Sequence, residues 1–102
     1  IVLCMHVPFF TDVIWRANRR FWSQKLASDI HDEVYKPSGD YLRQQEDPTT
    51  SQFIAELKKE PLLKAILAGH LHLTVEDQFS PTARQYVVGG NFMFHGREVI
   101  FV

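Results

Sequence analysis

Two short runs of hydrophobic residues lie far apart in the sequence, at 1–5 and at 64–68. Continuous apolar runs of this length, rich in β-branched and aliphatic residues, are typical of strands that a sheet buries on both faces. We therefore predict a buried strand at each position. Cys4 lies within the first run and is expected to be a buried thiol that packs as a small hydrophobe.

Apolar residues at helical spacing predict two helices between these runs. The first extends over 12–27 with arginines on its other side, and its apolar members are Ile14, Trp15, Phe21, Trp22 and Leu26. The second begins at Thr50 or Ser51, either of which can cap it through its hydroxyl group. Pro61 then interrupts the helical pattern.

The pattern changes to that of β-strands after residue 72. Strands are predicted over 73–79, 84–88 and 97–102, with turn residues between them. A helix between two parallel strands, followed by a meander of further strands, indicates an α/β fold whose sheet ends in an antiparallel part.

Length and composition are those of one small globular domain or a piece of a larger one, at 102 residues, 45% hydrophobic and 23% charged. The net charge of −1 gives no sign of nucleic acid or of a membrane surface as a partner. Cys4 is the one cysteine, which slightly favours a reducing, cytoplasmic compartment and leaves the localisation open. Because the sequence opens on an apolar strand without a methionine or a basic leader, we expect a single partial domain, 1–102, of a longer chain.

Histidines follow both apolar runs. His6 comes directly after the first run and precedes Pro8, which cannot donate to a sheet ladder. Gly69, His70 and His72 come directly after the second run. Because ligands bind outside the carboxyl ends of strands in open α/β sheets, we expect all three imidazole rings at one rim of the sheet.

The chemistry that these three rings share is metal binding, since neutral imidazole is a good ligand for Zn, Fe, Mn or Ni. Residues i and i+2 of an extended chain point the same way, so His70 and His72 are expected to face one cavity. Gly69 is expected to let the backbone leave the strand and approach the metals where a Cβ would clash.

The segments 2–8 and 68–72 together resemble the last two of the five ordered motifs of calcineurin-like metallophosphoesterases, a lone histidine after an apolar strand and Gly-His-x-His. The Gly-Gly turn at 89–90 is similar to a turn that often follows them in that family. The resemblance implies that 1–102 is the C-terminal half of a metallophosphoesterase β-sandwich flanked by helices. It also implies that 9–48 is a variable helical or loop insertion.

The same resemblance implies a binuclear metal centre. His6 and His70 would bind one divalent ion (Mn, Fe, Zn or similar) and His72 the other, while a missing N-terminal half would supply the bridging aspartate and the other ligands. The implied activity is hydrolysis of a phosphoester by the two ions, on a phosphorylated substrate whose type the residues do not specify. The piece alone is expected to be inactive and to associate with itself or with the missing half.

Two other functions stay open. The chain could be a non-catalytic binding or interaction module that keeps the phosphoesterase fold without the catalysis. It could also hold a single structural zinc ion through His6, His70 and His72, although three histidines without a fourth ligand are more typical of an open site.

Three residues close to His6 in the sequence are candidates for contact with the substrate. Phe10 follows His6 within the same loop, and the guanidinium groups of Arg16 and Arg20 have the chemistry to bind phosphate. The competing interpretation places the arginines on a solvated helix face and Phe10 in the core. His31 and His95 are expected to be exposed or structural rather than ligands.

Overall fold

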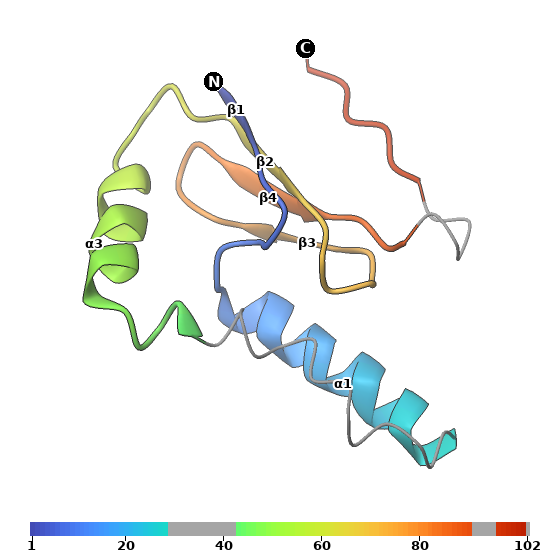
Figure 1. The fold of residues 1–102 in the computed structure, drawn as a ribbon. Helices are drawn as coiled ribbons and strands as arrows, with labels where there is room; N and C mark the ends of the chain where they lie inside the picture. Colours follow the sequence, from blue (N-terminus) through green and yellow to red (C-terminus); the bar gives the residue numbers. More distant parts are fainter. Residues whose placement is uncertain (29–42, 91–95, 102) are drawn as a thin grey trace.

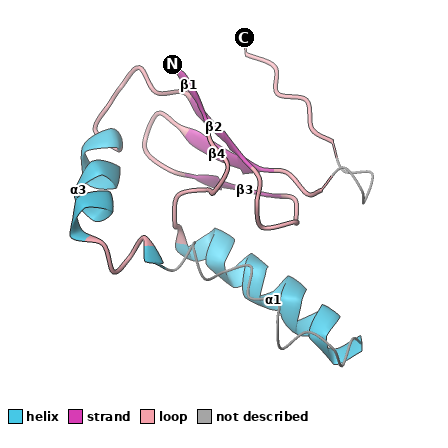
Figure 2. Cartoon of the chain, viewed as in Figure 1, coloured by secondary structure: helices cyan, strands magenta, loops and turns pink. Residues whose placement is uncertain are grey.

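The computed structural model of the chain describes residues 1–28, 43–90 and 96–101. These residues form two helices and one four-stranded sheet, which confirms an α/β fold (Figures 1 and 2). The elements in chain order are β1 (Val2–Cys4), α1 (Asp12–Ser28), α3 (Pro48–Leu57), β2 (Ala65–Ala68), β3 (Val75–Gln78) and β4 (Arg84–Val87). In the described part of the chain, no helix has the length and apolar character needed to span a membrane.

The strands lie in the order β1-β2-β4-β3. Pairing is parallel between β1 and β2 and between β2 and β4, and antiparallel between β3 and β4. The sheet ends in an antiparallel pair, as predicted. The predicted meander is wrong, because β4 lies between β2 and β3 rather than beyond β3. Burial explains this order, since β4 has the fully buried residues Gln85 and Val87 and β3 has none.

The two apolar runs differ in their place in the sheet. Ala65, Ile66 and Ala68 of β2 are buried between two neighbouring strands, as predicted. The same prediction is wrong for β1, which is an edge strand with exposed Val2 and Cys4. Both runs read alike because an apolar run shows that a strand can be buried and not how many neighbours it has.

Both helices pack on the same face of the sheet, over two groups of buried side chains. The first core cluster consists of Phe9, Leu63, Ile66, Phe79 and Ala83, with Ile54 and Leu57 of α3 packed against it. The second core cluster consists of Ile14 of α1 together with Leu71, Leu73 and Val87. Figure 1 shows the loop that follows β1 passing into α1 on this side of the sheet.

The start of α3 differs from the prediction. Asp47, rather than Thr50 or Ser51, caps the helix, and its carboxylate accepts hydrogen bonds from Thr49 N (3.0 Å) and Thr50 Oγ1 (2.7 Å). Pro48 then occupies the first turn, where the missing N–H costs nothing. A carboxylate one residue before proline is the stronger start signal, because it also suits the positive end of the helix dipole.

This cap predicts a pH-dependent contribution to stability. The hydrogen bonds from the Thr50 hydroxyl group and from the Thr49 N–H lower the pKa of Asp47 from 3.8. A carboxyl group whose pKa falls on folding stabilises the fold above its unfolded pKa, and this stabilisation is lost as the pH falls through the folded pKa. Asp47→Ala is therefore expected to lower Tm by a few degrees at pH 7. Thermal unfolding should show that the difference in Tm between the wild type and Asp47→Ala disappears once the pH is well below 3.8.

The adjacent exposed Glu46 offers a matched control for this cap. Glu46→Ala removes a carboxylate of similar exposure that makes no capping bond, so its Tm should follow that of the wild type at every pH. An equal loss in both variants, or a gap for Asp47→Ala that does not change with pH, would contradict the assignment of the cap.

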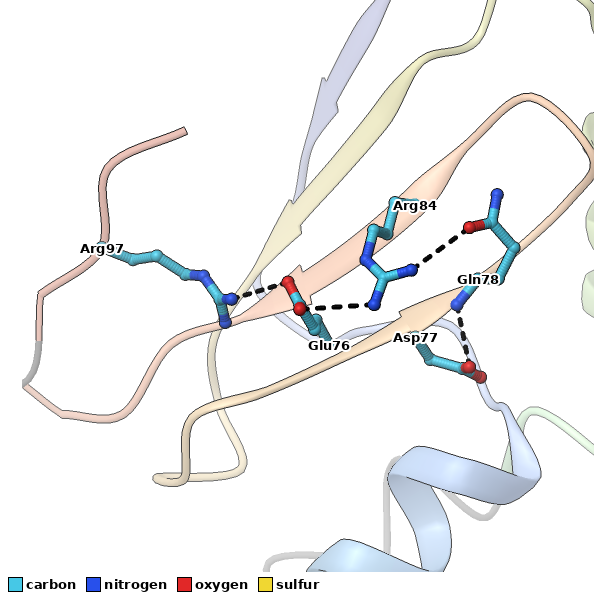
Figure 3. Close-up of polar contacts among 5 residues, drawn as sticks. All are labelled: Glu76, Asp77, Gln78, Arg84 and Arg97. Atoms are coloured by element: carbon cyan, nitrogen blue, oxygen red, sulfur yellow. Dashed lines mark hydrogen bonds and ion pairs between the residues drawn. The ribbon is translucent and has the colours of Figure 1, made fainter. Parts of the chain in front are cut away.

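Residues 96–101 lie along the opposite face of the sheet and form no strand, so the predicted strand at 97–102 is wrong over 97–101. Contacts between side chains, rather than backbone hydrogen bonds of a β-ladder, hold this segment on the sheet (Figure 3). Arg97 Nη2 lies 2.6 Å from Glu76 Oε2, and Arg84 Nη2 lies 3.3 Å from Glu76 Oε1. The Arg97 guanidinium also lies over the Tyr86 ring, 5.1 Å from its centroid. A hollow of about 250 Å³, lined mostly by apolar side chains, remains between this segment and strands β2 and β4.

Candidate metal centre

The adjacent parallel strands β1 and β2 bring two histidines together. His6 follows the end of β1 and His70 follows the end of β2, and the Gly69 N–H donates to the carbonyl oxygen of His6 at 3.0 Å. Nε2 of His6 lies 3.0 Å from Nδ1 of His70. The rings meet edge to face, with centroids 4.8 Å apart and an interplanar angle of 71°. The structure therefore places these two imidazoles at one rim of the sheet, at the carboxyl ends of its strands.

The loop after β2 has an unusual backbone. His70 and His72 have φ angles of 65° and 58°, in the left-handed region that residues other than glycine rarely adopt. Each such residue costs roughly 1–2 kcal/mol, and strain of this kind is concentrated at functional sites. Leu71 between them is fully buried in the second core cluster, so it anchors the loop to the core.

The protein atoms around Gly69 do not require a glycine. Its φ is not positive, and a Cβ built on it would have nothing within 4 Å, so its expected close approach to the metals stays a prediction. The histidines themselves adopt the left-handed conformation, so the argument from an extended chain does not apply to His70 and His72. No sequence pattern shows this, because residues other than glycine and asparagine seldom adopt positive φ.

His72 is half-buried in the same loop. Among residues 1–28, 43–90 and 96–101, no three His, Cys, Asp or Glu side chains come close enough together to hold a metal ion. His72 therefore does not join His6 and His70 in a three-ligand group. A closed structural zinc site needs four ligands, so the described residues do not complete one.

The distance between the two ring nitrogens tests whether one ion fits between them. With metal–nitrogen bonds of about 2.0–2.1 Å, two imidazole ligands lie about 2.9 Å apart at a right angle and about 3.3 Å apart at a tetrahedral angle. The observed distance between His6 Nε2 and His70 Nδ1 is 3.0 Å, which fits two adjacent ligands of one ion. The same distance also fits a hydrogen bond between the rings.

The candidate substrate residues lie on and before α1. Arg16 and Arg20 are exposed, one helical turn apart, and line a shallow hollow of about 260 Å³ with Val13 and Ala17. Phe10 is half-buried and packs against the second core cluster. The structure does not bring these three side chains into a described contact with the histidine pair. His31 and His95 lie outside the described residues.

Two glutamines that the sequence motifs did not indicate make hydrogen bonds close to His6. Gln85 is fully buried in β4, and Gln44 is half-buried before α3. Both side chains bind the backbone of the loop that follows His6. One signal in the sequence could have found the first of them, because Gln85 occupies an inward position of the alternating strand, between the buried Ala83 and Val87.

Comparison of the chain with protein-family models, with curated proteins and with solved structures finds no match.

Proposed function

We propose that this chain is the histidine-bearing part of a two-metal phosphoesterase. The observation that carries the proposal is the 3.0 Å contact between His6 and His70 at the carboxyl ends of two parallel strands. Strained left-handed backbone at His70 and His72 supports it, because a loop that served only to connect β2 to β3 would have no need of such strain. The resemblance of 2–8 and 68–72 to metallophosphoesterase motifs gives the reaction class.

The roles proposed for the histidines are those that the resemblance to metallophosphoesterases implies. His6 and His70 would hold one divalent ion (Mn, Fe, Zn or similar), and His72 would contribute to a second. When bound, the two ions would clamp the phosphate group and lower the pKa of a bound water. Arg16 and Arg20, exposed on the helix that follows His6, would orient the phosphate by charge-assisted hydrogen bonds. Carboxylate ligands from an N-terminal half would complete the centre.

A non-catalytic binding module is the second candidate function. It is favoured by the absence of a third ligand beside the histidine pair within the described residues. The two candidates differ in one outcome. Both allow the chain to bind a metal ion, but only the first predicts that a longer chain containing this segment hydrolyses a phosphoester.

The test combines metal binding with hydrolysis. The 102-residue chain is expected to bind Mn²⁺ or Zn²⁺ in calorimetric titration, and a longer chain with the N-terminal half is expected to hydrolyse an aryl phosphate with Mn²⁺. His72→Ala should lower the rate of hydrolysis by about 100-fold or more, because even the outer-shell partners of a metal site contribute 10- to 100-fold. His31→Ala, outside the motif, is the control and should retain the activity. Hydrolysis that persists in both variants would rule out the proposed role of His72.

A further inference from the structure

Two glutamine side chains hold the backbone of the loop that follows His6. Gln85 Nε2 donates to the Phe9 carbonyl oxygen at 2.9 Å, and its Oε1 accepts from the Phe9 N–H at 2.8 Å. Gln44 Nε2 donates to the Pro8 carbonyl oxygen at 2.6 Å, and its Oε1 accepts from the Phe10 N–H at 3.0 Å. We refer to Gln44 and Gln85 with these four hydrogen bonds as the glutamine clamp.

The Gln85 half of the clamp is deeply buried. Gln85 is 0% exposed and lies on the helix-covered face of β4, in register with Ile66 of β2. Its amide bonds both the N–H and the carbonyl group of Phe9, as a neighbouring strand would. A buried amide that keeps both partners stabilises a single arrangement, whereas loss of the amide leaves two buried backbone groups without partners.

The position of the clamp follows from the path of the chain. β1 lies at one edge of the sheet, while α1 contacts β3 at the other edge. The loop between β1 and α1 must therefore cross the sheet, and Gln85 on β4 holds it partway. The Phe9 ring is buried against Phe79, with centroids 5.4 Å apart, which fixes the loop at the same point.

His6 is thus supported on both sides. Its carbonyl oxygen accepts from the Gly69 N–H, which ties it to the loop that carries His70. Two residues further along, the clamp begins at Pro8, which is itself buried. His6 itself is exposed, so packing alone does not determine where its ring lies.

We propose that Gln85, assisted by Gln44, is a positioning residue that holds the His6 ring against His70. The placement of the ring rests on the geometry alone, and its consequence for metal binding rests on the function proposed above. Groups that orient the ligands of a metal site typically contribute 10- to 100-fold to affinity. The clamp is expected to contribute to the same extent.

The test compares two variants of the 102-residue chain. Gln85→Met retains the length of the side chain but removes both hydrogen bonds to Phe9. Leu63→Ala removes apolar contacts from the first core cluster, to which Phe9 belongs, and leaves the clamp intact. The first readout is the nuclear Overhauser effect between the His6 and His70 rings without metal. The second is the affinity for Mn²⁺ or Zn²⁺.

Gln85→Met is expected to remain folded, to lose most of the Overhauser effect between the rings, and to bind metal about 10- to 100-fold more weakly. Leu63→Ala is expected to keep both at the wild-type level while it melts at a lower temperature. A folded Gln85→Met chain with the full Overhauser effect would overturn the proposal, and so would an equal loss in Leu63→Ala.

Gln44→Met decides the question if Gln85→Met does not fold, because Gln44 lies on the half-buried side of the loop. It should weaken the Overhauser effect, and Gln44→Glu, which still accepts from the Phe10 N–H, should restore part of it. No weakening in Gln44→Met would then overturn the proposal. A wild-type chain that binds neither metal contradicts the proposed function, while the Overhauser effect still tests the clamp.

Discussion

Replacing His70 by glycine is expected to lower the affinity of the chain for Mn²⁺ or Zn²⁺ by about 100-fold or more, because one of two facing ligands is lost. The same replacement is expected to leave the free energy of unfolding unchanged or to raise it by up to about 1 kcal/mol. His70 has a φ of 65°, where a side chain is strained and glycine is not. Part of the relief is offset by the greater freedom of glycine in the unfolded chain.

His70→Ala is the matched control, since it removes the ring but keeps a Cβ in the left-handed conformation. It should lose the same affinity, and its free energy of unfolding should be lower than that of His70→Gly by about 1 kcal/mol. Calorimetric titration gives the affinities, and urea unfolding gives the stabilities. A glycine variant that is less stable than the alanine variant, or that binds metal as the wild type does, contradicts the prediction.

The strain at His70 and His72 bears on what the loop is for. A connection between β2 and β3 that served only the fold could place glycine at both positions and gain stability. Instead two histidines adopt the left-handed conformation on either side of the fully buried Leu71. Backbone strain of this kind is found most often at functional sites, so it agrees with the function proposed above.

Much of the fold was readable from local pattern. Over 12–27 the spacing of apolar residues gives α1 almost to the residue, because a helix that packs one face on a core repeats with its own turn. The edge position of β1 and the irregular path of 97–101 were not readable in this way. Both depend on which other segments lie beside them, and apolarity at Ile100 and Phe101 carries no such information.

In the candidate site, too, the sequence predicts what local pattern determines and misses what depends on tertiary contacts. The meeting of His6 with His70 follows from two strand ends, because neighbouring parallel strands end at the same side of a sheet. The left-handed loop is a property of tertiary context. The hydrogen bonds between Gln85 and Phe9 join residues 76 positions apart in the sequence. The inward position of Gln85 on β4 is the one feature of the sequence that indicates a buried role for it.

Ile66→Ala is expected to lower the free energy of unfolding by about 2–5 kcal/mol, the range for a large aliphatic residue truncated in a core. Ile66 is fully buried in β2, in register with Leu3 of β1 and Gln85 of β4. The free energy of unfolding of a typical domain is only about 5–15 kcal/mol, so this loss is a large share of the total stability. Ile100→Ala, at a site 73% exposed, should change the stability by less than about 0.5 kcal/mol.

The Ile66 variant also tests how the site depends on the sheet. β2 alone joins β1, and with it His6, to the rest of the sheet, and His70 follows from the end of β2 itself. As urea unfolds the Ile66→Ala chain, the Overhauser effect between the two rings should therefore disappear together with the helical signal. Urea titrations that follow both signals would contradict this dependence if the ring contact outlasted the helices, or if Ile66→Ala cost less than about 1 kcal/mol.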